Sequence, residues 1–270
     1  MEITGAVWLL GELIAVVSSL DGNFFSAAAV IVMAIGSGLA ALVWLCTKPF
    51  WTRKLNDGTH IKIRMGDITK QRGCAVLVGT NDELNCEDEA INCGSIQYQL
   101  QTNQALGDKI KQTFQAEREK HPTANYGTII PVTEDSDRQG RKKAMSDRAF
   151  HFLVMSKLKP NQNAETKLSE LDQAISDYFQ KIGQLYVPNK KLEVPLIGTG
   201  TAGVYSETNA KIDIAVRLVR HLIRGRGQHQ CQNVREMVIR IPWMDFRYIN
   251  WQQLDTLIEQ TLQICQECDC

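Results

Sequence analysis

The first 46 residues constrain the fold of this chain most, because they contain no Lys or Arg and only three acidic residues, Glu2, Glu12 and Asp21. Two apolar runs, 3–20 and 24–46, are separated only by Asp21-Gly22-Asn23. At ~1.5 Å of rise per residue, the second run crosses a hydrocarbon core of ~30 Å as a helix, and the first is just long enough. A turn this short joins antiparallel helices. The sequence therefore predicts a two-helix transmembrane hairpin over residues 1–46.

Basic residues set the orientation of the predicted hairpin. Lys48, Arg53 and Lys54 follow the second run, whereas the turn between the runs has no basic residue. Because positive charge favours the cytoplasmic side, we expect a multi-pass protein whose C-terminal part is cytoplasmic and whose partner is the lipid bilayer. A cleaved signal peptide is disfavoured, since no basic residue precedes Ile3 and a second long apolar run follows the first.

Two features inside the predicted hairpin exceed what an anchor needs. Glu12 lies midway along the first run, where an ionisable group is costly and tends to face protein or water. It either lines a pathway or is protonated or hydrogen-bonded to a neighbouring helix, and the sequence leaves both alternatives open. Gly36 and Gly38 belong to a small-residue face that permits close helix packing and so favours a homo-oligomer. We take Glu12, Gly36 and Gly38 as candidate membrane-output residues.

Strand-like and helical patterns alternate over residues 59–270, which follow a predicted juxtamembrane linker at 47–58. Apolar alternation or continuous apolar runs predict six strands, at 61–65, 74–78, 128–132, 150–155, 192–197 and 237–241. Apolar residues at helical spacing predict helices over 168–185 and 212–223, and a last helix starting near Asn250. This order indicates an α/β domain of three layers.

Two loops of the predicted domain have the chemistry of a nucleotide site, because ligands of such sheets bind where strands lead into helices. Gly66-Asp67-Ile68-Thr69 offers a carboxylate that could accept hydrogen bonds from an exocyclic amine, although an Asp before a Thr is more often a helix N-cap. The segment 195–204 runs from a strand into a G-x-G-x-x-G turn and a helix. Its glycines would let backbone N–H groups approach a pyrophosphate, and a purely structural turn remains an equal alternative.

The net charge and the spacing of the Cys and His residues argue against a nucleic-acid-binding protein and against a metal site. The chain has a formal charge of zero, so its part beyond the predicted hairpin has an excess of only +3. Nucleic-acid surfaces concentrate more positive charge, and no nucleic-acid partner is expected. Cys265, Cys268 and Cys270 form a C-x-x-C-x-C tail without a fourth ligand, and the five histidines show no ligand spacing. We therefore predict no metal site.

Together, the early Gly66-Asp67-Ile68-Thr69 and the late Ile197-Gly198-Thr199-Gly200 resemble the two signature loops of a macro domain. The resemblance implies a macro-like fold with a mixed sheet and a site for an ADP-ribose derivative, with no cofactor. By this resemblance Asp67 would hold the adenine amino group, and Gly66 and Ile68 would be further ligand-binding residues of the same loop. The backbone of the late loop would surround the diphosphate, through Gly198, Thr199, Gly200, Thr201, Ala202, Gly203 and Val204.

The middle of the chain narrows the resemblance to the macro-like domain of Thoeris anti-phage effectors, through Asn81-Asp82-Glu83, residues 95–99 and residues 152–158. That family implies a bacterial inner-membrane effector that senses a nucleotide second messenger from a TIR-domain enzyme and then disrupts the membrane. The messenger would be ADP-ribose or a derivative of it, such as a cyclic form or an amino-acid conjugate, among which the sequence does not choose. The resemblance places Asn81 and Asp82 near the distal ribose, with Ser95 and Gln99 facing it.

Three functions follow as hypotheses. The first is the sensor-effector just described, which has no catalytic residue. The second is a membrane-tethered ADP-ribosyl hydrolase that uses Asn81 or Asp82 to position a water, although the glycine run of hydrolytic macro domains does not follow these residues. The third is a passive reader that docks on ADP-ribosylated proteins.

Overall fold

The structure is a computed structural model that describes residues 33–34, 36–38, 50–86, 95–134, 147–159, 164–197, 208–242, 245 and 249–267. The chain divides into two units, Met1–Lys48 and Pro49–Cys270. In the first unit, the described residues 33–34 and 36–38 are helical. The remainder of the predicted hairpin, including Glu12, lies outside the described residues. No helix within the described ranges combines the length and apolar character needed to cross a membrane.

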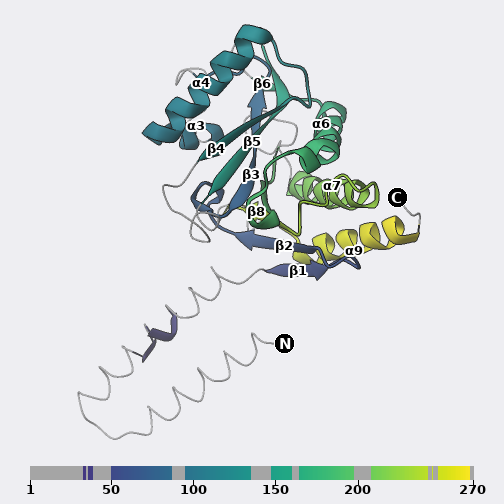
Figure 1. The fold of residues 1–270 in the computed structure, drawn as a ribbon. Coiled ribbons are helices and arrows are strands. Elements are labelled where there is room, and N and C mark those ends of the chain that lie inside the picture. Colours follow the sequence, from purple (N-terminus) through teal and green to yellow (C-terminus); the bar gives the residue numbers. More distant parts are fainter. Residues whose placement is uncertain are drawn as a thin grey trace, which may run out of the picture. The chain divides into compact units, whose positions relative to one another are not determined.

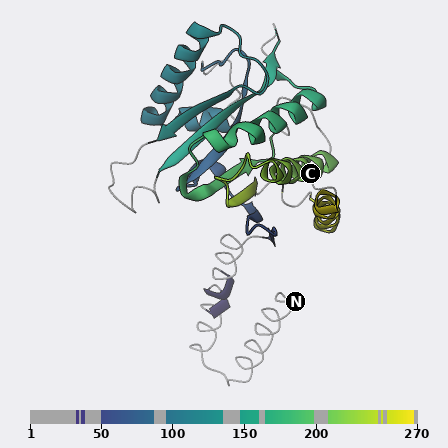
Figure 2. The same cartoon turned by 45° about the vertical axis from the view of Figure 1, so that its right-hand side comes forward.

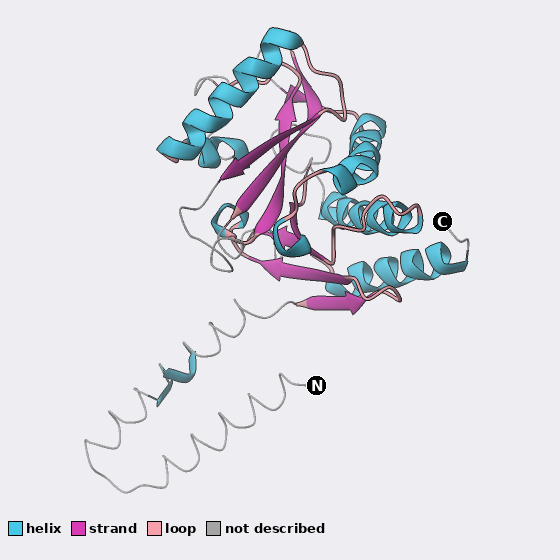
Figure 3. Ribbon diagram, viewed as in Figure 1, coloured by secondary structure: helices cyan, strands magenta, loops and turns pink. Residues whose placement is uncertain are grey.

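The second unit is built on a mixed sheet whose strands run in the order β1-β2-β8-β7-β3-β5-β4, with β6 paired to β5 (Figure 3). The five inner strands pair in parallel, and β1, β4 and β6 pair antiparallel to their neighbours. The strands are β1 (Trp51–Lys54), β2 (His60–Met65), β3 (Cys74–Asn81), β4 (Ile129–Glu134), β5 (Arg148–Leu158), β6 (Ala164–Glu165), β7 (Lys191–Pro195) and β8 (Glu236–Ile241).

Helices cover both faces of this sheet, which confirms the predicted three layers (Figures 1 and 2). One face carries α3 and α4, and the other carries α6, α7 and α9. The helices are η1 (Ile68–Lys70), α3 (Ile96–Gln101), α4 (Gln104–Lys120), α6 (Leu168–Lys181), η2 (Ile182–Gln184), η3 (Pro188–Lys190), α7 (Thr208–Gly227) and α9 (Trp251–Glu267).

Strand β3 shows why the central strands read as continuous apolar runs. Its residues Cys74, Val76 and Val78 pack toward α3 and α4, whereas Ala75 and Leu77 pack into the cluster of α6, α7 and α9. All five side chains are fully buried. Because helices cover both faces, neither side of the strand needs polar residues.

Several elements have no counterpart in the sequence prediction. Trp51–Lys54 form β1, so this part of the predicted linker 47–58 belongs to the domain. The strand was missed because only Trp51 is half-buried and its other three residues are exposed, which leaves no apolar alternation. Helices α3 and α4 were also missed. The buried stripe of α4 consists of Leu106, Ile110 and Phe114 in a strongly polar sequence.

Candidate functional site

The predicted loop at Gly66 begins where β2 ends, and we call residues 66–71 the Gly66 loop. Gly66 has φ of +126°, and a Cβ at this position would lie 3.5 Å from Nη1 of Arg240. Its N–H donates to the carbonyl of Ile241, the last residue of the neighbouring strand β8. The Cβ would make only an ordinary contact with the arginine, but any side chain would strain this backbone conformation, which explains why glycine occupies the position.

Asp67 caps the short helix η1. Its Oδ1 accepts hydrogen bonds from the backbone N–H of Thr69 at 2.9 Å and from the Thr69 hydroxyl at 2.6 Å. Partial burial by itself would raise the pKa of Asp67, but the hydrogen bonds from Thr69 and the nearby Lys70 ammonium outweigh it and lower the pKa. The side chain is 38% exposed. The alternative N-cap interpretation is therefore what the structure shows, and the same ionised carboxylate keeps lone pairs free toward solvent.

Arg240 of β8 fixes the Gly66 loop through hydrogen bonds. Its guanidinium donates to the carbonyl of Met65 at 3.0 Å and to Oε1 of Gln71 at 2.8 Å, and Gln71 in turn donates to the carbonyl of Asp67 at 2.8 Å. The charge of Arg240 is matched by the buried carboxylate of Glu193, whose Oε2 lies 2.7 Å from Nε. Both ends of the loop are thus tied to one buried ion pair.

Arg148, the first residue of β5, holds the middle of the same loop. Its Nη1 donates to the carbonyl of Thr69 at 2.6 Å, and its Nε pairs with Glu134. The guanidinium also lies over the ring of Phe150 at 5.2 Å. Sequence reasoning did not single out Arg148, Glu193 or Arg240 as residues of the site. The available signal was a charged residue inside an apolar strand run.

Asn81 and Asp82, at the end of β3, mainly make structural contacts. Oδ1 of Asp82 accepts from the backbone N–H of Leu158 at 2.9 Å, and the Asp82 side chain is buried. Oδ1 of Asn81 accepts weakly from the N–H of Asn85 at 3.4 Å. Asp82 therefore ties the ends of β3 and β5 together, a role that sequence reasoning did not foresee.

Ser95 and Gln99 lie on α3, one helical turn apart. Oγ of Ser95 caps the helix by accepting from the N–H of Tyr98 at 3.1 Å, and Gln99 is exposed. Between them, the buried Gln97 donates to the carbonyl of Asn85 at 2.8 Å. Because α3 packs against both β3 and η1, these residues share one side of the sheet with the Gly66 loop.

The late loop, from Gly198 to Val204, lies outside the described residues. The strand before it, β7, ends at Pro195, which pairs in register with Arg240 of β8. Ile241 of β8 pairs with Met65 of β2. The two loops of the sequence prediction therefore leave strands that are separated only by β8, the strand that holds the Gly66 loop.

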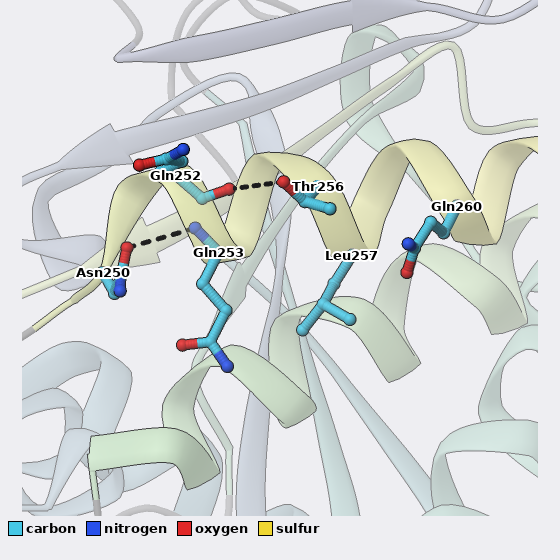
Figure 4. Close-up of a pocket in the computed structure, with 6 residues that line it drawn as sticks. All are labelled: Asn250, Gln252, Gln253, Thr256, Leu257 and Gln260. Atoms are coloured by element: carbon cyan, nitrogen blue, oxygen red, sulfur yellow. Dashed lines mark hydrogen bonds between the residues drawn. The ribbon is translucent and has the colours of Figure 1, made fainter.

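A shallow groove runs along α9, which sequence reasoning did not single out. Figure 4 shows its lining: Asn250, Gln252, Gln253, Thr256, Leu257 and Gln260. Oδ1 of Asn250 caps the helix by accepting from the N–H of Gln253 at 3.1 Å. The side chains of Gln253 and Leu257 extend toward the neighbouring helix, α7, against which α9 packs. Since α9 follows the carboxyl end of β8, the groove starts at the ligand-binding edge expected for such sheets.

Trp251 and the metal-ligand residues have plain structural surroundings. Trp251 contacts Phe50 with 5.9 Å between ring centroids and packs against the core, so its role in the described residues is packing. Within the described ranges, no cluster of His, Cys, Asp or Glu could hold a metal ion. Cys265 is buried on α9, and the other two cysteines of the tail lie outside those ranges.

The mixed sheet between two helical layers, with a capped Gly-Asp loop after the second strand, defines an α/β domain of the macro type. The sequence model described as "Thoeris protein ThsA, Macro domain" matches residues 61–239. The chain belongs to this family.

Solved macrodomain structures are also similar to this chain. The Oceanobacillus iheyensis macrodomain with MES bound is 14% identical, covers 80% of this chain and 97% of its own, and superposes with a TM-score of 0.46. The same macrodomain with ADP gives 14% identity, 80% and 96% coverage, and a TM-score of 0.46. No curated protein matches the chain. The family assignment rests on the family match alone.

Proposed function

We propose that this chain is a membrane effector of bacterial anti-phage defence whose macro domain senses an ADP-ribose-derived signal made by a TIR-domain enzyme. The family match over residues 61–239 carries this proposal. It is supported by the Gly66 loop, where an ionised, partly exposed carboxylate is oriented by Thr69 and the loop itself is held in place by two arginines. Such an acceptor suits the amino group of adenine, because a fixed carboxylate needs no reordering when the ligand binds.

The remaining parts of the proposed site follow the family resemblance. Backbone N–H groups between Gly198 and Val204 would bind the diphosphate, and Asn81, Ser95 and Gln99 would approach the distal ribose. Asp82 is included in the proposed site because it lies at the end of β3 beside Asn81. Its Oδ1 already accepts a hydrogen bond from the N–H of Leu158. We assign the site to binding without turnover.

The output in this proposal comes from residues 1–46, which form a transmembrane hairpin of the bacterial inner membrane. The length of the two apolar runs, which contain no Lys or Arg, and the basic residues after them support this placement. Nucleotide binding would cluster the hairpins of several copies through Gly36 and Gly38 and disrupt the bilayer, with Glu12 near the membrane centre. In helical residues 36–38, a Cβ added to either glycine meets no described atom within 4 Å, so both positions are open to a neighbour.

Binding of nucleotides to the full chain in detergent tests the sensor. We expect ADP-ribose, a cyclic form or an amino-acid conjugate to raise the melting temperature, and Asp67→Ala to weaken the binding at least tenfold. Asp108→Ala, which removes an exposed carboxylate from α4, is the matched control and should bind like the wild type. The proposal is wrong if none of the three nucleotide classes binds.

Product analysis separates sensing from hydrolysis. The bound nucleotide should be recovered intact after hours of incubation, and esters of ADP-ribose should persist. Turnover that is lost in Asp82→Asn, which keeps an acceptor for the Leu158 N–H, would instead establish a hydrolase. Asp82→Ala is the poorer variant because it also removes that structural hydrogen bond. Binding only to ADP-ribosylated protein, and to no free nucleotide, would indicate a passive reader.

A further inference from the structure

The connection between the two units enters the sheet at the same edge as the Gly66 loop. Strand β1 runs antiparallel to β2, with Trp51 opposite Ile63 and Lys54 opposite His60. The N–H of Phe50 donates to the carbonyl of Ile63 at 2.9 Å. The chain therefore joins the domain beside the last residues of β2, and Gly66 follows Met65 directly.

Strand β1 is held on its side-chain face by α9. Nε1 of Trp51 donates to Oδ1 of Asp255 at 2.6 Å, and Arg53 pairs with Glu259. The Arg53 guanidinium also lies over the Trp51 ring at 5.9 Å, and Phe50 contacts Trp251. We call these contacts between Phe50, Trp51 and Arg53 of the leading segment and Trp251, Asp255 and Glu259 of the helix the β1–α9 clasp.

The groove lies on a different side of α9 from the clasp. Asn250, Gln253 and Leu257 line the groove, while Trp251, Asp255 and Glu259 face β1. A third set of α9 residues, Leu254, Ile258 and Leu262, is buried in the core. One helix thus contacts the groove, the core and the leading strand at once. A displacement of a rigid helix on one face moves the groups on its other faces with it.

We propose that α9 transmits nucleotide binding to the N-terminal unit, because it follows β8, which holds the Gly66 loop through Arg240 and Ile241, and because its Asp255 and Glu259 contact the strand through which that unit is attached. This inference rests on the proposed function and names the residues that carry its signal. A ligand acts in this way by binding better to one position of α9 than to another. Without the clasp, β1 would still pair with β2, but a movement of α9 would have no side-chain contact through which to reach the segment that leads to the N-terminal unit.

The test uses the full chain in vesicles of phosphatidylethanolamine and phosphatidylglycerol that contain a self-quenched dye, with ADP-ribose, cyclic ADP-ribose and an amino-acid conjugate as probes. Binding is measured separately from output, which is dye release or nucleotide-dependent oligomerisation in detergent. We expect Asp255→Ala/Glu259→Ala to bind within twofold of the wild type, while the nucleotide concentration for half-maximal output rises at least tenfold.

Two further variants control for charge and for folding. Asp108→Ala/Glu119→Ala removes two exposed carboxylates from α4 and should behave like the wild type. Arg53→Glu should lose output, and Arg53→Glu/Glu259→Arg should regain it, because the reversed pair restores the ionic contact. Restored output excludes a simple failure to fold.

Each outcome decides the inference. Output at the wild-type nucleotide concentration in the clasp variant overturns it, and so does output without nucleotide, which would make the clasp an inhibitory latch. Loss of binding in step with output also overturns it, because α9 would then act only at the site. If the wild type itself fails to bind any probe, the proposed function fails. If the wild type binds without any output, nothing is transmitted and the inference fails alone.

Discussion

The Gly66 loop and the β1–α9 clasp both adjoin strand β2 but are held by opposite kinds of interaction. The loop depends on buried charge, since Arg240 and Glu193 are almost fully removed from solvent. The clasp depends on contacts at the surface, where the Arg53 and Glu259 side chains are 47% and 42% exposed. A buried pair is costly to break, whereas an exposed pair can be exchanged with water at little cost. The difference suits a fixed recognition loop beside an adjustable connection.

Removal of Arg240 should produce the largest effect. Arg240→Met leaves the buried carboxylate of Glu193 with only Lys191, 2.8 Å away, and frees the carbonyl of Met65. We expect a loss of roughly 3 kcal/mol in the free energy of unfolding, as for other broken buried pairs. Chemical denaturation of the full chain in detergent measures it, and Arg240→Met/Glu193→Gln should recover part of the loss. A loss below ~1 kcal/mol would remove the contrast between the two regions.

The second prediction concerns the buried His151 and the dependence of the unfolding free energy on pH. His151 of β5 lies in the core, with Nδ1 2.9 Å from the Tyr178 hydroxyl and Nε2 3.2 Å from the carbonyl of Tyr186. Burial lowers the pKa of His151 to about 4. The unfolded chain, with a pKa near 6.5, therefore binds the proton first as the pH falls.

The domain should therefore be fully stable, with respect to this group, above pH ~6.5 and lose roughly 3 kcal/mol as the pH falls to about 4. His151→Gln, whose amide can contact both partners, should have a correspondingly flatter dependence of unfolding free energy on pH. Denaturation at several pH values compares the two proteins, so that the titration of carboxyl groups common to both cancels. Equal slopes would mean that His151 binds its proton over the same pH range in the folded domain as in the unfolded chain.

The clasp should show the smallest effect on stability. Arg53→Ala removes an exposed pair, for which we expect a loss of about 0.5 kcal/mol that vanishes in high salt. The same denaturation measurement detects it. A loss as large as that of Arg240→Met would show that the clasp is as rigid as the loop, and an adjustable connection could then be ruled out.

The sequence predicted the domain better than its site, for physical reasons. Apolar runs located six strands and the helices α6, α7 and α9, because burial on both faces of the sheet leaves a strong pattern. The strand β1 and the helix α4 bury too few residues to leave one. Glu193 and Arg240 were passed over because a charge within an apolar run gives no hint of its partner, which lies on another strand.

Asp67 and Asp82 illustrate why the roles of site residues were harder to predict than the fold. The sequence offered a helix N-cap as an alternative role for Asp67, and η1 shows it, but only the fold revealed that Asp82 holds the end of β5. Such hydrogen bonds join residues according to backbone position, which sequence spacing does not encode. The structural role and the proposed binding role of Asp67 are compatible, because a carboxylate can accept from more than one donor.

The two outer strands of the sheet bear on how copies of this protein can associate. Strand β1 presents the exposed Arg53 and Lys54, and β4 carries Pro131, which has no N–H to donate. Positive charge and proline on outer strands both discourage strand-to-strand pairing between molecules. Both outer strands of the sheet thus disfavour fibre-like growth, which leaves helical surfaces as the better place for copies of the chain to associate.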